Sequence, residues 1–263
     1  MTDAGGSTAS YEAAYRVRFD EAGPDGRLRT SGLLRYTQDL AARHSEALGY
    51  DRAWYRERSL TWLVRTAEIE IAAPIPYGAE VAGTTRVVGF RRVWSRREST
   101  FRVGSRLAAL VRIDWVLLDG GGSPTRIPSE FEVFFTSSAP SAGLQLGRVR
   151  LGEPRPEARQ RTITVRPQEL DPLDHVNNAV YADWLDEAVL AAAGDDGALA
   201  VHGLPRRVRL EYALAAEPRE TLETLTWWDD GGWSCAVRRG SDSADLLRAR
   251  LEPMAELIQT PGV

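Results

Sequence analysis

The chain has 263 residues, of which 43% are hydrophobic and 27% charged, a composition typical of a soluble globular protein with one large domain or two ordinary ones. Its net charge of -4 argues against general nucleic-acid binding, and no apolar run approaches the roughly 20 residues of a membrane span. The single cysteine, Cys235, excludes an internal disulfide and a cysteine-based zinc site, and it predicts a reducing, cytoplasmic location. There is no lysine, which excludes Schiff-base chemistry.

The first half of the chain predicts a strand, a loop, a long helix and four further strands. Alternation of Tyr15, Val17 and Phe19 predicts a half-buried strand over residues 14–19, before a turn-rich loop. Apolar residues at helical spacing predict a helix over 33–48 that stops at Gly49, with His44 on its core-facing side. Strand patterns follow at 62–71, 80–89, 94–103 and 108–118.

The second half repeats this order after a segment without apolar periodicity. We expect an N-terminal domain over 1–136, a linker over 137–160 and a C-terminal domain over 161–263. The C-terminal pattern is a strand at 163–165, a polar loop at 166–177, a helix at 178–193 and strands at 208–212, 221–228, 233–238 and 246–251. An α+β fold is therefore predicted, in which each copy has a long helix and an antiparallel meander, and the two sheets pair edge to edge.

Two offsets relate the copies. An offset of 146 residues pairs Asp25 with Asp171 and leaves Arg29 where the second copy has His175. In the strands, Glu70 and Glu211 match at an offset of 141. The sequence therefore predicts one structural copy and one active copy.

The loop that precedes the second helix carries the candidate chemistry. Asp171 could act as a base on water or attack directly, and His175 could orient it or carry a proton near neutral pH. Asn177 or Asn178 is a suitable N-cap, and the helix N-terminus behind it could hold an oxyanion. The alternative is that Asp171 caps a turn and His175 is an ordinary loop histidine. One helix face is predicted to enter the core: Val180, Tyr181, Trp184, Leu185, Ala188 and Val189.

Asp171-(three residues)-His175-Val-Asn177-Asn178-(two residues)-Tyr181 resembles the signature of hotdog-fold thioesterases. The doubled arrangement is similar to the acyl-acyl-carrier-protein thioesterases of plants and bacteria. The resemblance implies two tandem hotdog domains, each a long helix wrapped by a curved antiparallel sheet. It also implies hydrolysis of fatty acyl thioesters on acyl carrier protein, with no metal and no cofactor.

Roles for single residues follow from this resemblance. The catalytic candidates are Asp171, His175 and Asn177, and the substrate-binding candidates are Asn178, Tyr181 and Glu211. For Asn177 and Asn178 a capping role is as well supported as substrate contact. The acidic carrier protein and its acyl-phosphopantetheine could dock on a basic cluster, or the cluster could be a solvated strand face. Its members are Arg91, Arg92, Arg96 and Arg97.

The sequence departs from the plant enzymes at three positions. Leu173 stands where they carry an asparagine, and Ala215 and Ala216 stand where they carry an acidic residue and often a cysteine. These departures favour a non-catalytic acyl-binding protein as one alternative, and an acyl-CoA thioesterase and a dehydratase of the same fold are the others. The chain could be a monomer, because two fused copies complete one hotdog pair, or a homodimer.

Overall fold

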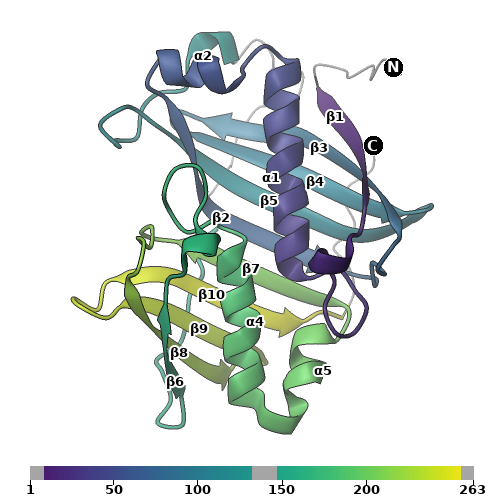
Figure 1. The fold of residues 1–263 in the computed structure, drawn as a ribbon, viewed down its shortest axis with the longest axis vertical. Helices are drawn as coiled ribbons and strands as arrows, with labels where there is room; N and C mark the ends of the chain where they lie inside the picture. Colours follow the sequence, from purple (N-terminus) through teal and green to yellow (C-terminus); the bar gives the residue numbers. More distant parts are fainter. Residues whose placement is uncertain (1–8, 132–146, 256–263) are drawn as a thin grey trace.

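The computed structural model describes residues 9–131 and 147–255, which form two similar halves (Figure 1). The elements of the first half are β1 (Ser10–Arg16), α1 (Thr30–Ala47), α2 (Arg52–Glu57), β2 (Thr61–Ile71), β3 (Glu80–Arg91), β4 (Trp94–Val103) and β5 (Arg106–Leu118). Those of the second half are β6 (Arg159–Thr164), α4 (Val180–Ala193), α5 (Gly197–His202), β7 (Arg206–Tyr212), β8 (Thr221–Asp229), β9 (Gly232–Arg239) and β10 (Asp245–Pro253). None of the described helices is long and apolar enough to cross a membrane.

A single antiparallel sheet runs through both halves, in the order β1-β3-β4-β5-β2-β7-β10-β9-β8-β6. The halves join where β2 pairs with β7, with Thr66 opposite Glu211 and Glu70 opposite Arg207. This pairing removes two exposed strand edges, which would otherwise be open to other chains. The predicted α+β fold and the edge-to-edge pairing are confirmed.

The two copies share one loop construction, which corrects the predicted register of the repeat. Glu21 accepts a hydrogen bond from the Arg18 N–H and another from the Tyr36 hydroxyl. At an offset of 148 residues, Glu169 accepts from the Arg166 N–H and the Trp184 indole. The predicted offset of 146 is wrong in this loop, because the capping turn before the loop fixes the register.

With the corrected register, Gly23 is the counterpart of Asp171 and Arg27 is the counterpart of His175. In the following strands the offset is 141, since Ala79 and Glu220 accept the N–H groups of Val17 and Val165. The matching positions of Glu70 and Glu211 agree with this offset. The first copy therefore keeps the architecture of the loop without its acid and histidine.

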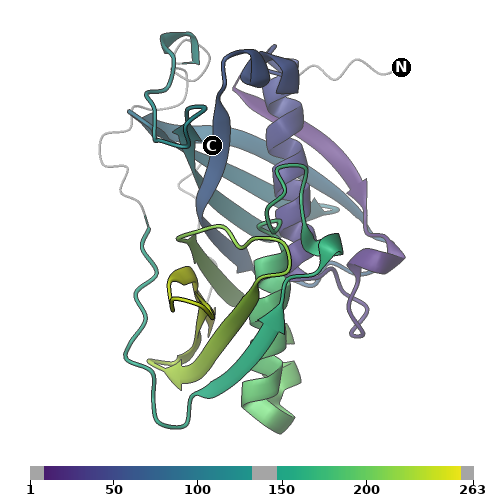
Figure 2. The ribbon, with the colours of Figure 1, turned by 60° about the vertical axis from the view of Figure 1, so that its left-hand side comes forward.

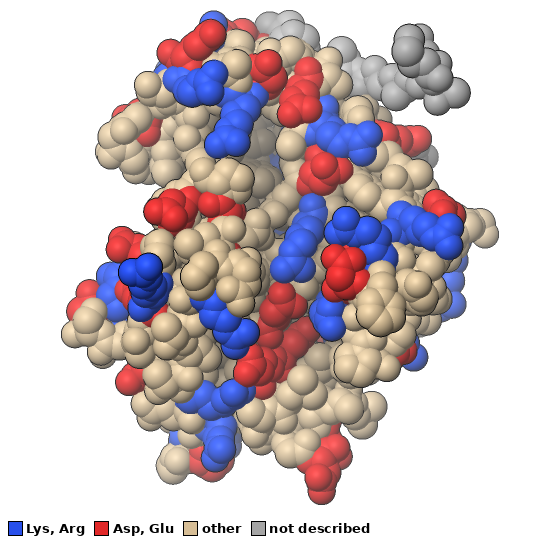
Figure 3. Space-filling view, in the orientation of Figure 1, with Lys and Arg blue, Asp and Glu red and all other residues tan. Residues whose placement is uncertain are grey.

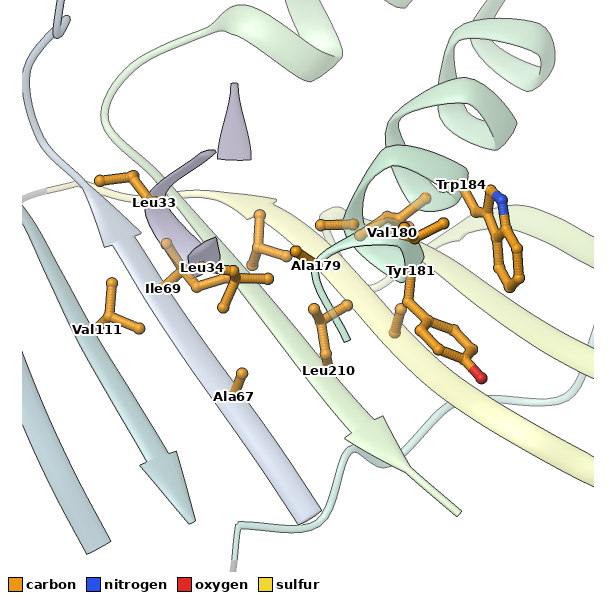
Figure 4. Close-up of a cluster of buried hydrophobic side chains, with 14 of the residues drawn as sticks. Leu33, Leu34, Ala67, Ile69, Val111, Ala179, Val180, Tyr181, Trp184 and Leu210 are labelled. Carbon is orange, nitrogen blue, oxygen red and sulfur yellow. The ribbon is translucent and has the colours of Figure 1, made fainter. Parts of the chain in front are cut away.

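Both long helices lie on the same face of the sheet, and the core lies beneath them (Figures 1 and 2). All residues predicted on the inner face of the second helix are buried. Figure 4 shows the core where the halves meet. Its labelled side chains come from α1 (Leu33, Leu34), from the sheet (Ala67, Ile69, Val111, Leu210) and from the start of α4 (Ala179, Val180, Tyr181, Trp184). Phe19 departs from the prediction: β1 ends at Arg16, and Phe19 begins a 3-10 turn with 83% of its surface exposed.

Residues 147–149 of the predicted linker lie against the outer face of the sheet. The segment runs along the side of the sheet away from the helices (Figure 2). Val149 is buried there, and its N–H donates to Glu211 Oε2 at 2.9 Å. Residues 137–146 of the predicted linker lie outside the described residues. The domain boundaries therefore stay predictions.

Candidate functional site

The loop with Asp171 and His175 forms a tight turn, and these two residues lie opposite each other where the turn closes. The Asp171 N–H donates to the His175 carbonyl oxygen at 2.8 Å, and the Asp174 N–H donates to the Asp171 carbonyl oxygen at 2.9 Å. Asp171 Oδ1 also accepts the Leu173 N–H at 2.8 Å. Asp171 is half-buried and His175 is exposed, and no hydrogen bond joins these two side chains in the described structure. The acid and the histidine are therefore joined through the backbone of one turn, and their side chains are not hydrogen-bonded to each other.

Asn177 connects this loop to the helix of the other half. Its Oδ1 accepts the Ala179 N–H at 2.9 Å, which caps the turn before α4. Its Nδ2 donates to Gln38 Oε1 on α1 at 3.4 Å. The loop of the second half is therefore held beside the first helix.

The turn that leads into α4 contains a backbone donor, the Asn178 N–H, that remains available. The N–H groups of Ala179 and Val180 both donate to Asn177. The N–H of Asn178 finds no acceptor among the described residues, while its carbonyl oxygen accepts the Tyr212 hydroxyl at 2.9 Å. This N–H lies at the positive end of the helix, where it can stabilise a developing negative charge.

Two of the predicted substrate-binding residues have structural contacts. Tyr181 is 1% exposed, and its hydroxyl oxygen accepts the Ala216 N–H at 3.0 Å. Since Ala216 also accepts the Val176 N–H, Tyr181 supports the loop from within the core. Glu211 lies on the outer face of the sheet beside Arg65, where it shares its face with Arg207 and Arg209. Contacts of Tyr181 and Glu211 with substrate stay predictions.

A cavity of about 190 Å³ lies between α1 and the sheet of the first half. Gln38, the residue that contacts Asn177, is part of its wall. The other wall residues include Ser45, Tyr55, Trp62, Arg97 and Phe131. The side chain of Trp62 forms part of this wall, whereas that of Trp184 is buried in the core. The loop of one half and the cavity of the other therefore adjoin at the contact between Asn177 and Gln38.

The four arginines of the predicted docking cluster do not share one surface. Arg97 is 8% exposed and points toward α1, where its guanidinium contacts His44. Arg96 points to the outer face and forms an ion pair with Asp114 at 2.6 Å. Arg91 and Arg92 are exposed at the tip between β3 and β4. Strand alternation therefore removes Arg97 from the predicted docking surface.

A larger cavity of about 840 Å³ occupies the equivalent place on the other side, between the 18–31 loop and α4. Arg29 and Asp186 stand here at the positions that match Asn177 and Gln38. Arginines and carboxylates alternate where the two halves meet (Figure 3). The cavity also contains an acid and histidine pair from opposite halves, because His202 Nδ1 lies 3.3 Å from Asp25 Oδ2. No local pattern in the sequence predicts this pair, because Asp25 and His202 come from opposite halves of the chain.

Asp186 is unusual in this cavity because one carboxylate oxygen, Oδ1, is buried and has no hydrogen-bond partner among the described residues. Burial raises the pKa of the Asp186 carboxyl from 3.8 to about 7, against the opposing pull of Arg206 and Arg29. The folded chain therefore binds a proton that the unfolded chain has already released between these pH values.

The free energy of unfolding is expected to fall as the pH rises from about 4 to 7, and Asp186→Asn is expected to remove about 1–3 kcal/mol of this decrease. The physical reason is that a raised pKa stabilises the folded state below the unfolded value and loses this contribution through the folded value. Urea unfolding at pH 4.5 and pH 8 checks the effect, with the exposed Glu187→Gln as the control. An unchanged pH dependence in Asp186→Asn would contradict it.

Both halves of the chain match models of one protein family. The family model of the acyl-ACP thioesterase N-terminal domain matches residues 8–131, and that of the acyl-ACP thioesterase C-terminal domain matches residues 152–239. A chloroplastic acyl-[acyl-carrier-protein] hydrolase of Cuphea viscosissima is 24% identical over 95% of this chain and 61% of its own length. The chain spans about three fifths of the length of the curated plant relatives that it matches.

Two solved structures have the same fold. An acyl-ACP thioesterase from Bacteroides thetaiotaomicron superposes with a TM-score of 0.77 at 15% identity, covering 92% of this chain and 97% of that one. A 12:0-ACP thioesterase from Umbellularia californica superposes with a TM-score of 0.73 at 19% identity, covering 92% and 96%. The predicted tandem hotdog architecture is thereby confirmed. Because the two family domains match in order across most of its length, this chain belongs to the acyl-ACP thioesterase family.

Proposed function

We propose that this protein hydrolyses acyl thioesters carried on acyl carrier protein. The observation that carries the proposal is the contact between Asn177 and Gln38, which sets the loop of Asp171 and His175 beside the cavity of the first half. A thioester at the loop could place its acyl chain in that cavity. The exposed Arg91 and Arg92 remain the part of the basic cluster proposed to meet the acidic carrier.

The reaction needs a base, a donor to the carbonyl oxygen and a proton for the leaving thiolate. Asp171 is the proposed base: its Oδ1 is engaged by the Leu173 N–H, and Oδ2 would take a proton from the attacking water. The Asn178 N–H would stabilise the oxyanion of the tetrahedral intermediate. When the carbon–sulfur bond breaks, His175 would protonate the thiolate of phosphopantetheine. The products are a free acid and the thiol form of the carrier.

The departures from the plant enzymes lie around the same loop. Leu173 is 50% exposed at the turn, and Ala215 is exposed just before Ala216, which holds the loop. Neither side chain can donate or accept a hydrogen bond. Asp171 and His175 would therefore carry out the proton transfers alone.

Thiol release from matched acyl-carrier-protein and acyl-CoA substrates tests the proposed function. The wild type is expected to release thiol from the carrier-protein substrates, with the same acyl group on CoA reacting more slowly. His202→Ala is the comparison variant, because it removes the acid and histidine pair of the other cavity. Faster hydrolysis of the CoA substrate would show that coenzyme A, and not acyl carrier protein, carries the preferred substrate. The absence of thiol release from every substrate would favour a non-catalytic acyl-binding protein. A loss of activity in His202→Ala would indicate that catalysis takes place in the cavity that contains Asp25 and His202.

A further inference from the structure

The cavity beside α1 contains a buried positive charge. Arg97 lies on the inner face of β4, in alternation with Ser95 and Phe101, and its side chain forms part of the cavity wall. Its Nη1 donates to His44 Nδ1 at 2.7 Å. Burial lowers the pKa of the Arg97 guanidinium to about 10, so the group stays protonated near neutral pH.

No carboxylate neutralises this charge within the described part of the chain. The neighbouring acid, Glu98, points to the opposite face and pairs with Arg86 and Arg112. None of the ion pairs among residues 9–131 and 147–255 includes Arg97. A buried guanidinium without a counter-charge is costly, and a plain hydrocarbon chain beside it would leave that cost unrelieved.

The same cavity has a second donor that lacks an acceptor. The indole Nε1 of Trp115 is buried in the cavity wall and has no hydrogen-bond partner among the described residues. In contrast, the Trp62 indole donates to the Tyr55 hydroxyl at 3.1 Å, and that hydroxyl is 3.0 Å from Ser45 Oγ. The unused groups of the cavity are thus donors, and a ligand that fits them supplies acceptors.

We infer that this cavity binds acyl groups that end in a carboxylate, with the guanidinium of Arg97 as the partner of that carboxylate. The inference rests on the proposed function, in which the thioester lies at the loop and the acyl chain enters the cavity. Gln38 marks the end of the cavity beside the loop, and the contact of Arg97 with His44 lies six residues farther along α1. At the rise of an α-helix this is roughly 9 Å, which suits a short chain that spans from the thioester to a distal acid.

Arginine is suited to this role because its planar fork can donate two parallel hydrogen bonds to one carboxylate. Only one of its donors is used by His44. The Trp115 indole, in the wall of the same cavity, offers a further donor. Arg97 would therefore determine which acyl groups bind, while the hydrolysis itself would take place at the loop of Asp171 and His175.

The experiment compares two carrier-protein thioesters of equal chain length, one ending in a methyl group and one in a carboxylate. For the wild type, kcat/KM is expected to be at least about tenfold higher with the carboxylate-ended substrate. Arg97→Met, which keeps an unbranched side chain and removes the charge, is expected to abolish or reverse this preference. Arg97→Lys, which keeps the charge without the fork, is expected to retain part of it. Arg102→Met, an exposed change on the same strand, is the control and is expected to leave the ratio unaltered.

A titration of the protein with the free acids separates this inference from the proposed function. The dicarboxylic acid is expected to bind more tightly than the monocarboxylic acid of equal length, and Arg97→Met is expected to remove the difference. This binding difference can be measured even if no thioester is hydrolysed. A lack of hydrolysis would overturn the proposed function and leave the inference about Arg97 standing. Equal binding of the two acids by the wild type, or a preference for the methyl-ended chain, would overturn the inference.

Discussion

Asp171→Ala is expected to lower kcat for acyl-carrier-protein hydrolysis at least about a hundredfold, with a small change in KM. The size follows from general-base catalysis, which typically contributes a factor of about 10² to 10⁴. Asp171 is half-buried where the turn closes opposite His175, and its Oδ2 is the proposed proton acceptor. Thiol release under single-turnover conditions measures the chemical step directly.

Two further variants separate the chemistry of Asp171 from its part in the turn. Asp171→Asn keeps an acceptor for the Leu173 N–H but cannot act as a base, so it is expected to be as inactive as the alanine variant. Asp174→Asn is the matched control, because Asp174 is exposed with a φ of 61°, a conformation that asparagine tolerates. Full activity in Asp171→Asn would show that the residue shapes the loop and that another group is the base.

Leu210→Ala is expected to lower the free energy of unfolding by about 2–5 kcal/mol, the range for a large-to-small change in a close-packed core. Leu210 lies on β7 at the junction of the halves and is 0% exposed. Its neighbours come from both copies, including Ala67 of β2, which it faces across the sheet (Figure 4). The alanine would leave a cavity that neither half can close alone. Urea denaturation measures the loss.

Leu199→Ala is the control for this prediction, because it makes the same chemical change at a residue that is 75% exposed. A surface change of this kind is expected to stay within about 0.5 kcal/mol. If both variants lost the same stability, burial at the junction would not be the cause of the effect at Leu210.

Local periodicity predicted much of this fold. The inner face of α4 was predicted residue by residue, because apolar side chains at spacings of three and four mark one side of any helix. The strand pattern of the second half and the buried position of Cys235 follow from similar local rules. The alternation of β7 likewise carried the information that Glu211 faces outward, beside Arg207 and Arg209.

Other features had no local signal. On β4, polar side chains occupy both faces, with Arg96 and Glu98 outward and Ser95 and Arg97 inward, so a period of two cannot tell which arginine is buried. The predicted register of the repeat was wrong because it aligned two identical residues, Asp25 and Asp171. The structurally equivalent residues are Glu21 and Glu169, which accept equivalent hydrogen bonds.

Local sequence patterns were enough to predict the class of fold, the doubled plan and the loop that carries Asp171 and His175, because each depends on residues close together in the chain. The contacts of that loop with the other half could not be predicted in this way. Asn177 and Gln38 are 139 residues apart, and Asp25 and His202 come from opposite halves. Such contacts depend on the register in which β2 pairs with β7, and this register is set by packing across the whole sheet.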